Sequence, residues 1–267
     1  MTSPATAPDA GRTRELWSVG DYQRVGVRLV PASEQLVADL QVRPGERLLD
    51  VGGGTGNTAL AAARRDADVV CSDIVPELLE YAVKRAEMEG LSFTTEIADA
   101  QALPYDDGSF DIVTSTIGVV FAADADRAAA EIVRVLRPGG RFGLTAWVPQ
   151  APGGKLLQLV RQHDPRDHPG DPLRWGTRDG VEQLFARRGV TLRYAERATD
   201  FTAPSPEVQW ERYIDWYAPV RVAWERLDEA GRQAFHDEFV AMWGSYSRGS
   251  PGILVPNTYL QVIGTKS

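Results

Sequence analysis

The chain has 267 residues, of which 43% are hydrophobic and 25% are charged, as in ordinary globular proteins. Its formal net charge of −8 disfavours nucleic acid as a partner, because nucleic-acid binding takes its affinity from Lys and Arg at phosphates. The single cysteine, Cys71, excludes an intramolecular disulfide. We therefore expect a cytoplasmic protein that has no signal peptide and does not enter a membrane.

The first part of the chain separates into a tail and a cap. Residues 1–13 are rich in Pro, Ala and Thr and predict a disordered tail. Residues 14–45 are expected to form a helical cap, because 31–40 has a helical pattern that stops at the Pro44-Gly45 turn.

From residue 47 onward, short apolar runs alternate with helical patterns. Strands are predicted over 47–51, 67–72, 92–97, 110–115 and 141–148, and helices over 58–65, 76–89 and 126–136, the last ended by the sequence RPGG at 137–140. This alternation is typical of a parallel sheet with helices on both faces.

The pattern changes after residue 148. A helix is expected over 181–188, a strand over 191–202, a long helical stretch over 207–242 and a final strand over 253–265. The predicted fold class is α/β, a doubly wound, mostly parallel, seven-stranded, Rossmann-like sheet over 46–267, with a helical insertion at about 205–248 before the last strand. Aromatic residues at 210, 213, 217 and 224 of the insertion are expected to pack as core, with Trp216 off that stripe.

The sequence LLDVGGGTGNTAL at 48–60 predicts a ligand-binding turn after the first strand. Glycines permit positive φ and close approach of a ligand, and folds of this type bind ligands at the carboxyl ends of their strands. A phosphate-binding P-loop would need Gly-Lys-Ser/Thr, whereas Asn57 and Thr58 follow the glycines here. A dinucleotide also fits poorly, because Asp50 at the strand end would repel its pyrophosphate.

A ligand that carries positive charge suits this turn better. S-adenosylmethionine has an ammonium and a sulfonium that Asp50 would attract, and a carboxylate that the helix N-terminus can accept. Gly52 and Gly54 would then give the ligand close access to the backbone.

Side chains at the ends of the following strands complete the predicted adenosyl site. Asp73 ends the second strand, where its carboxylate can accept from both ribose hydroxyls, and Ile74 offers an apolar face to adenine. Asp99, just past the third strand, can accept from the exocyclic amine, with the Ala100 amide near a ring nitrogen. Ser115, at the end of the fourth strand, would place its backbone carbonyl near the ammonium.

Together these motifs resemble the class I S-adenosylmethionine-dependent methyltransferases. The resemblance rests on Asp-x-Gly-x-Gly-x-Gly at 50–56, on Asp73, on ADAQALPYDDGSFDIV at 98–113 and on EIVRVLRPGG at 131–140, and it covers about 47–148. Within this class the chain is similar to the group that includes the quinone-biosynthesis and many small-molecule methyltransferases. That group often has an aromatic or His pair after the fourth strand, where this chain has IGVVF at 117–121 and supplies no base.

The resemblance implies methyl transfer from S-adenosylmethionine to a small, apolar or aromatic metabolite. It also implies that Tyr22 lines the site, because segments like the aromatic 17–22 often fold over the cofactor in this family. The expected partner is a small-molecule acceptor, and a homodimer is left open. Two alternatives remain: a relative that binds this cofactor but catalyses a non-methylating reaction, and a non-catalytic cofactor-binding member.

The sequence does not single out a catalytic residue. His163 and His168 follow the fifth strand and its helix, on the side where substrates enter this fold, and either could act as a general base. The sequence HDPRDH at 163–168 has prolines and irregular spacing, so no metal site is predicted there.

Overall fold

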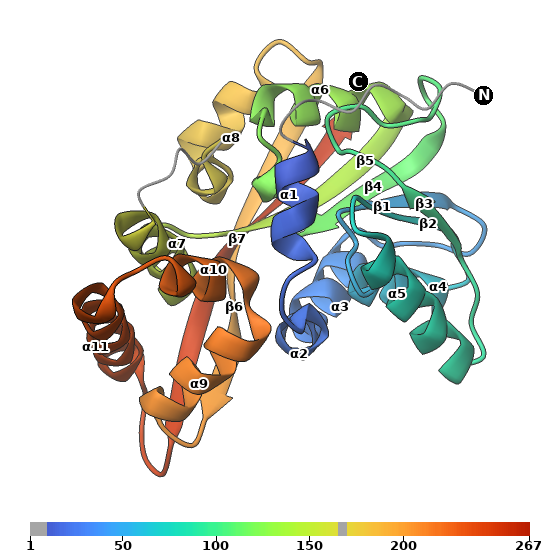
Figure 1. Cartoon of the computed structure of the whole chain (residues 1–267). Coiled ribbons are helices and arrows are strands. Elements are labelled where there is room, and N and C mark those ends of the chain that lie inside the picture. The colour runs from blue at the N-terminus through green and yellow to red at the C-terminus, as the bar shows by residue number, and fades with distance from the viewer. Residues whose placement is uncertain (1–9, 165–169) are drawn as a thin grey trace.

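The computed structural model describes residues 10–164 and 170–267 of the chain. Its strands form one sheet in the order β3-β2-β1-β4-β5-β7-β6 (Figure 1). Neighbours among β1 to β5 are parallel, and β7 is antiparallel to both β5 and β6. The strands are β1 (Arg47–Val51), β2 (Asp68–Asp73), β3 (Thr94–Ile97), β4 (Phe110–Thr116), β5 (Leu136–Trp147), β6 (Val190–Ala203) and β7 (Ile253–Lys266). The predicted α/β class, with a mostly parallel, seven-stranded, Rossmann-like sheet, is confirmed.

The helices fall into three groups along the chain. The N-terminal group is α1 (Ala10–Trp17), α2 (Tyr22–Gly26), the short 3-10 helix η1 (Val27–Leu29) and α3 (Val30–Asp39). The helices between the strands are α4 (Asn57–Ala63), α5 (Pro76–Met88), η2 (Val119–Phe121), α6 (Ala125–Val135), α7 (Pro152–His163), η3 (Pro172–Gly176) and α8 (Arg178–Phe185). The third group is α9 (Pro206–Trp216), α10 (Ala218–Glu225) and α11 (Glu229–Tyr246). None of these described helices has the length and apolar character needed to cross a membrane.

The central strands are apolar on both faces because helices cover both faces of the sheet. Successive side chains of a strand point to opposite sides. In β1, Leu48 belongs to the apolar cluster that contains Leu36 of α3, whereas Leu49 belongs to the cluster that contains Ile132 of α6. Both leucines are fully buried. The short apolar run that signals this strand in the sequence is therefore a consequence of its place in the middle of the sheet.

The sequence RPGG at 137–140 lies inside β5, which corrects the predicted start of that strand. Helix α6 ends at Val135, and β5 begins at Leu136. Leu136 pairs with Phe110 of β4, but the next paired residues are Arg141 and Ile112. The residues between Leu136 and Arg141 thus form a bulge, which Gly139 makes feasible with a φ of +73°.

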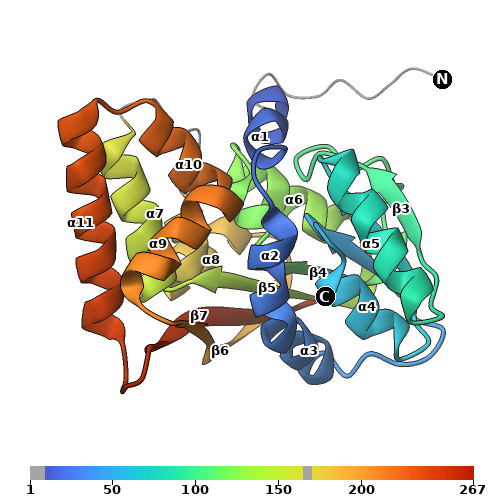
Figure 2. The same cartoon turned by 60° about the horizontal axis from the view of Figure 1, so that its bottom comes forward.

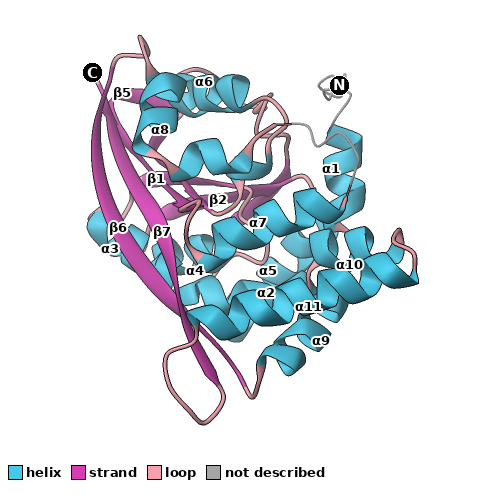
Figure 3. Cartoon of the chain, turned by 90° about the vertical axis from the view of Figure 1, so that its left-hand side faces the viewer, coloured by secondary structure: helices cyan, strands magenta, loops and turns pink. Residues whose placement is uncertain are grey.

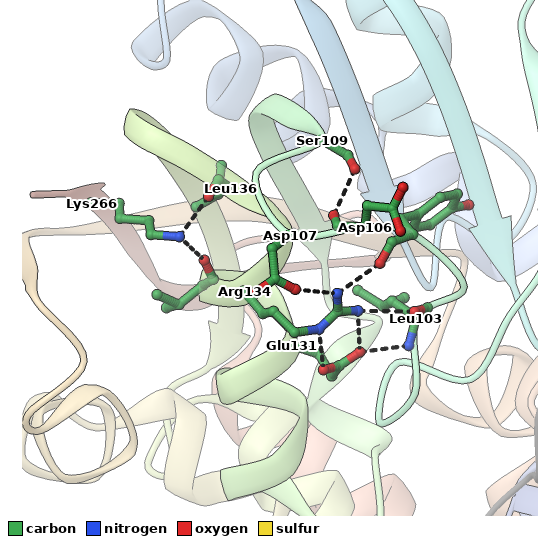
Figure 4. Close-up of polar contacts among 10 residues, drawn as sticks. Leu103, Asp106, Asp107, Ser109, Glu131, Arg134, Leu136 and Lys266 are labelled. Carbon is green, nitrogen blue, oxygen red and sulfur yellow. Dashed lines mark hydrogen bonds and ion pairs between the residues drawn. The ribbon is translucent and has the colours of Figure 1, made fainter.

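A lysine from the last strand stabilises the end of α6. The ammonium of Lys266 donates to the carbonyl oxygens of Val133, at 2.8 Å, and Leu136, at 2.6 Å (Figure 4). Carbonyls at a helix C-terminus have no partner within the helix, so a cation that binds them is favourable. This contact joins residues that are far apart in the sequence, which is why the sequence pattern alone misplaces the boundary.

The first helix begins nearer the N-terminus than the sequence predicts. Helix α1 begins at Ala10, so the prediction of a disordered tail over 1–13 is wrong for residues 10–13, while residues 1–9 lie outside the described part. The ring of Trp17 at the end of α1 lies 5.4 Å from the ring of Tyr22, 4.7 Å from that of Phe121 and 5.8 Å from that of Tyr217. These ring contacts hold α1 on the rest of the molecule.

The insertion and the N-terminal helices lie next to each other. Strands β6 and β7 form a long antiparallel pair (Figure 3). The connection between them contains α9, α10 and α11. Figure 2 shows α1, α2 and α3 in the middle of the molecule, with α9 and α10 on one side and α4 and α5 on the other. Contacts join α2 to α9 and α1 to α10.

One arginine fastens the loop after β3 to helix α6. The guanidinium of Arg134 donates to both carboxylate oxygens of Glu131, at 2.7 and 2.8 Å, and to the carbonyls of Tyr105, at 2.7 Å, and Leu103, at 3.0 Å (Figure 4). It also pairs with Asp107 at 2.9 Å. Glu131 in turn accepts from the backbone N–H of Leu103 at 2.7 Å. The loop is therefore positioned by hydrogen bonds to one charged pair.

We expect the change Arg134→Met to lower the free energy of unfolding by about 1–3 kcal/mol, because the carbonyls of Leu103 and Tyr105 lose the guanidinium donor and Glu131 keeps only the N–H of Leu103. The matched control is Arg127→Met, an exposed position on the same helix, which should change stability little. Urea denaturation of both variants is the measurement. Equal midpoints for the two variants would show that Arg134 does not hold the loop.

A second prediction concerns the close packing of β7 on β5. A Cβ added at Gly264 would overlap the ring of Phe142, its partner across the two strands, and that ring is itself stacked on Phe185 at 4.6 Å. Gly264→Ala should therefore destabilise the protein by roughly 1–3 kcal/mol through overpacking. In the same denaturation assay, Gly11→Ala, which meets no neighbouring atom within 4 Å, should be neutral or slightly stabilising. A neutral Gly264→Ala would contradict this packing.

Candidate cofactor site

A cavity opens to solvent at the carboxyl ends of β1, β2 and β4. It has the position expected of a small-molecule site in an open parallel sheet. Of the residues predicted from the sequence, the cavity is lined by Tyr22, Gly52, Gly54, Asp73, Ile74, Asp99 and Ala100. The structure also places Thr13, Trp17, Leu78, Ala98, Gln101, Ile117, Gly118, Val119, Phe121 and Ala122 on its wall. Asp50 and Ser115 are not on this wall.

The glycine loop after β1 uses conformations and contacts that side chains would disturb. Gly52, Gly54 and Gly56 have φ values of +61°, +54° and +81°. A Cβ at Gly52 would lie 3.1 Å from the Cα of Gly118, so the loop after β4 approaches the glycine loop closely. A Cβ at Gly54 would lie 3.4 Å from the Tyr22 ring and 4.0 Å from the Asp73 carboxylate, both of which line the cavity. The missing side chain at Gly54 therefore contributes to the open space.

The carboxylate of Asp73 connects the glycine loop to the end of β2. Its Oδ2 accepts from the backbone N–H of Gly54 at 2.8 Å, and its Oδ1 accepts from that of Val75 at 2.9 Å. Burial raises the pKa of Asp73, and the hydrogen bonds from the backbone N–H groups of Val75, Gly54 and Ile74 act in the opposite direction. The carboxylate is 8% exposed, and it lines the cavity beside the apolar side chains of Ile74 and Leu78.

Asp99 is held in place by its neighbour Gln101. The Asp99 carboxylate accepts from the backbone N–H of Gln101 at 2.9 Å and from its side-chain amide at 3.0 Å. The amide oxygen of Gln101 accepts from the backbone N–H of Asp124 at 2.8 Å, which ties the Asp99 turn to the start of α6. The carboxylate of Asp99 thus lies at the cavity wall with its orientation fixed. The sequence analysis did not identify Gln101, although this residue lies within the motif at 98–113.

The Ser115 side chain supports the site from behind, and the predicted place of its backbone carbonyl near the ammonium stays a prediction. Its hydroxyl donates to the carbonyl of Val51 at 2.6 Å and accepts from the N–H of Val119 at 2.8 Å. The wall is made instead by the next residues, Ile117 to Val119. Ile117 has a φ of +53°, a strained conformation for a β-branched residue, and such strain is often found at functional sites.

Asp50 also lies behind the glycine loop and is not among the residues that line the cavity; the predicted attraction of its carboxylate for an ammonium or sulfonium stays a prediction. Its side chain is fully buried, its Oδ1 accepts from the Thr114 hydroxyl at 2.9 Å, and its Oδ2 has no hydrogen-bond partner. A Cβ at Gly53 would lie 2.8 Å from this Oδ2. Burial raises the pKa of Asp50 to about 7, and hydrogen bonds from the Thr114 hydroxyl and the Ala59 N–H act against it.

Three aromatic side chains of the described residues line the cavity. Trp17 and Tyr22 come from the N-terminal helices, and Phe121 comes from the loop after β4. Burial raises the pKa of the Tyr22 hydroxyl above its ordinary value, and the nearby Asp73 carboxylate adds to this effect. The hydroxyl therefore stays protonated at neutral pH. The contribution of Phe121 could have been read from the sequence IGVVF at 117–121, because this short segment after the fourth strand ends in an aromatic residue.

Of the two histidines considered from the sequence, His163 is not among the described residues that line the cavity. The ring of His163, at the end of α7, stacks on Phe235 at 4.7 Å, and its Nε2 lies 3.2 Å from a Glu238 carboxylate oxygen. His163 thus faces α11 and does not face the cavity. His168 lies outside the described residues. Within residues 10–164 and 170–267, no group of three or more His, Cys, Asp or Glu side chains could hold a metal ion.

The raised pKa of Asp50 predicts a specific pH dependence of stability. Between the ordinary value of 3.8 and about 7, the folded state keeps a proton that the unfolded state releases. The free energy of unfolding should therefore fall as the pH rises through this window. Asp50→Asn should flatten that fall, and Asp68→Asn, on an exposed residue of β2, should not. Denaturation at several pH values is the measurement, and an unchanged slope in Asp50→Asn would contradict the assignment.

Comparison with known proteins agrees with this geometry. A family model described as a methyltransferase domain matches residues 49–144. The uncharacterized protein Rv1403c of Mycobacterium tuberculosis is 42% identical over 187 residues, which are 69% of this chain and 68% of that protein. A demethylmenaquinone methyltransferase of Deinococcus radiodurans is 42% identical over 121 residues, which are 44% of this chain and 50% of that enzyme.

Solved structures share the fold at low sequence identity. The YcgJ protein of Bacillus subtilis has a TM-score of 0.62 at 21% identity, with 88% of this chain and 98% of that one covered. The [4+2]-cyclase SpnF has a TM-score of 0.56 at 22% identity, with 89% and 80% covered. From the matching domain model, the relatives and the glycine-loop cavity at the strand ends, we conclude that the chain belongs to the class I S-adenosylmethionine-dependent methyltransferases.

Proposed function

We propose that this chain transfers the methyl group of S-adenosylmethionine to a small apolar or aromatic metabolite. The observation that carries the proposal is the convergence on one cavity of a glycine loop, two carboxylates at successive strand ends and an aromatic cover. A glycine loop alone would suit several ligands. The combination with Asp73 and Asp99 suits a ligand that has both ribose hydroxyls and an adenine amine to donate.

The cavity wall offers a partner for each part of the cofactor. Asp73 would accept from the ribose hydroxyls, and Ile74 and Leu78 would contact the adenine face. Asp99 would accept from the exocyclic amine. The space that a side chain at Gly54 would fill, between the Tyr22 ring and the Asp73 carboxylate, would hold the ligand close to the backbone.

When bound, S-adenosylmethionine supplies a methyl group on a sulfonium, which is already activated for in-line displacement. The task of this chain is then to align the acceptor with the methyl group and to exclude water. Trp17, Tyr22 and Phe121 are suited to the second task, because their rings cover the cavity with apolar surface. Two of them come from the N-terminal helices, so these helices form the cover.

The described wall contains no His, Lys or Arg that could take a proton from the acceptor. Tyr22 stays protonated, because burial raises the pKa of its hydroxyl. An acceptor that is nucleophilic as it arrives would therefore suit this site. The similarity to a demethylmenaquinone methyltransferase supports an aromatic acceptor, although it covers only half of that enzyme.

Incubation of the protein with methyl-labelled S-adenosylmethionine and a metabolite extract tests the proposal. A labelled product and an equal amount of S-adenosylhomocysteine are expected. A new product without S-adenosylhomocysteine would instead support a non-methylating enzyme, as the cyclase SpnF is among the fold relatives. Cofactor binding without any turnover would support a non-catalytic member, and both results would overturn the proposal.

A binding experiment tests the cofactor site separately. Asp73→Ala should weaken binding of S-adenosylhomocysteine by roughly 1.5–3 kcal/mol, since a charged acceptor of two hydroxyls is lost. Asp68→Ala, an exposed acid on the same strand, is the matched control and should bind normally. Because Asp73 also holds the loop, Gly54→Val provides a second variant that blocks the space directly. Normal calorimetric affinity in both site variants would remove this cavity as the cofactor site.

A further inference from the structure

The helical insertion has an interior built of aromatic rings. The rings of Trp210 and Phe239 lie 5.2 Å apart, and those of Tyr213 and Trp243 lie 5.6 Å apart. All four side chains are at most 8% exposed. The sequence prediction that the aromatic stripe packs as core is in line with this interior. The interior also contains polar groups, which apolar packing does not explain.

Polar atoms without partners lie inside this aromatic interior. Gln209 is 0% exposed, and neither its amide oxygen nor its amide nitrogen has a hydrogen-bond partner. The indole N–H of Trp243, also 0% exposed, has none either. A buried polar group without a partner costs free energy of folding, so nearly all such groups in proteins are paired. An apolar side chain at position 209 would be the more stable choice.

Two tyrosine hydroxyls near Gln209 also lack hydrogen-bond partners within the described part of the chain. Tyr213 lies one helical turn after Gln209 on α9, and residues four apart share a helix face. The ring of Tyr217 lies 5.5 Å from that of Tyr213. Among the described residues, neither hydroxyl has a hydrogen-bond partner, and the two side chains are 3% and 7% exposed. Gln209, Tyr213 and Tyr217 thus form a row of unpaired polar groups, which we call the polar row.

The polar row leads to the cofactor cavity. The ring of Tyr217 lies 5.8 Å from that of Trp17, which lines the cavity. Trp17 in turn contacts Tyr22, another lining residue, at 5.4 Å between rings. The contact between α1 and α10 brings these rings together, and Figure 2 shows the two helices side by side. The row therefore starts one aromatic ring away from the proposed methyl donor.

We propose that the polar row is the acceptor-binding part of the site, and that it recognises a planar aromatic ring bearing a neutral oxygen substituent. This inference rests on the proposed methyl transfer, since it places the acceptor next to the cofactor. Aromatic walls favour a flat ring. Burial raises the pKa of both tyrosine hydroxyls, so they remain donors at neutral pH. Together with the amide of Gln209, they would pair with an oxygen and not with a purely apolar ligand.

A matched pair of probes tests this recognition. Binding of 2-naphthol and of naphthalene is measured by fluorescence with the protein saturated with S-adenosylhomocysteine. The native protein should prefer 2-naphthol by ~tenfold, which corresponds to about one hydrogen bond. Tyr213→Phe and Gln209→Leu should abolish that preference, while Tyr81→Phe, a half-exposed tyrosine on α5, should keep it. Equal binding of the two probes, or no binding of either, would overturn the proposal.

A stability measurement separates recognition from a structural role. If Gln209 serves an acceptor, Gln209→Leu should raise the melting temperature by a few degrees, because it removes an unpaired buried amide. If Gln209 holds the insertion together, the same change should lower the melting temperature, which would overturn the proposal. Calorimetry with S-adenosylhomocysteine tests the cofactor site independently of the polar row. If the native protein does not bind S-adenosylhomocysteine, the proposed function is wrong. If it binds S-adenosylhomocysteine but does not distinguish 2-naphthol from naphthalene, only the role of the polar row is wrong.

Discussion

The site depends on one carboxylate that accepts from the backbone at two strand ends. Asp73, at the end of β2, receives the N–H of Gly54 at 2.8 Å and the N–H of Val75 at 2.9 Å. These bonds fix the glycine loop that follows β1, and the loop in turn approaches Gly118 after β4. Three segments that are far apart in the sequence are thereby held around one cavity. The cost of burying the charge is reduced because backbone N–H groups surround it.

The two halves of the proposed site are built from different parts of the chain. The cofactor half comes from the parallel sheet, and the family model over 49–144 covers its glycine loop and both carboxylates. The acceptor half comes from the N-terminal helices and from α9 to α11, which lie outside that match. The similarity to solved structures, at low sequence identity, establishes the fold only. The acceptor has to be inferred from the polar row and the aromatic cover. The same division explains why cofactor chemistry is easier to predict than acceptor chemistry.

The sequence predicts the parallel part of the fold well because each strand there is a short apolar run between helices. It misplaces the start of β5, since the pairing of Leu136 with Phe110 and the contact of Lys266 with the end of α6 are long-range. It also assigns residues 10–13 to a disordered tail, because the contacts that anchor α1 are made by Trp17 with rings from other segments. Local patterns contain no information on such partners.

For the site, the sequence identifies the acids and glycines but cannot tell which of them face the ligand. Asp50 and Asp73 both stand at strand ends, yet Asp50 is one of the buried side chains behind the loop and Asp73 lines the cavity. Asp50 pairs with Cys71, two residues before Asp73, so Asp73 lies further along the strands toward the cavity, while Gly53 closely approaches Asp50. Gln209 could not have been singled out, because an unpaired buried amide is visible only in three dimensions.

A crystal structure with S-adenosylhomocysteine bound would show directly whether Asp73 and Asp99 hold the cofactor. We expect the ribose hydroxyls within hydrogen-bond distance of the Asp73 carboxylate and the adenine amine within hydrogen-bond distance of Asp99. We also expect the sulfur under the Trp17 and Tyr22 rings, facing Tyr217. Density for the ligand elsewhere, or in this cavity with its ribose away from Asp73, would show that these carboxylates do not hold the cofactor.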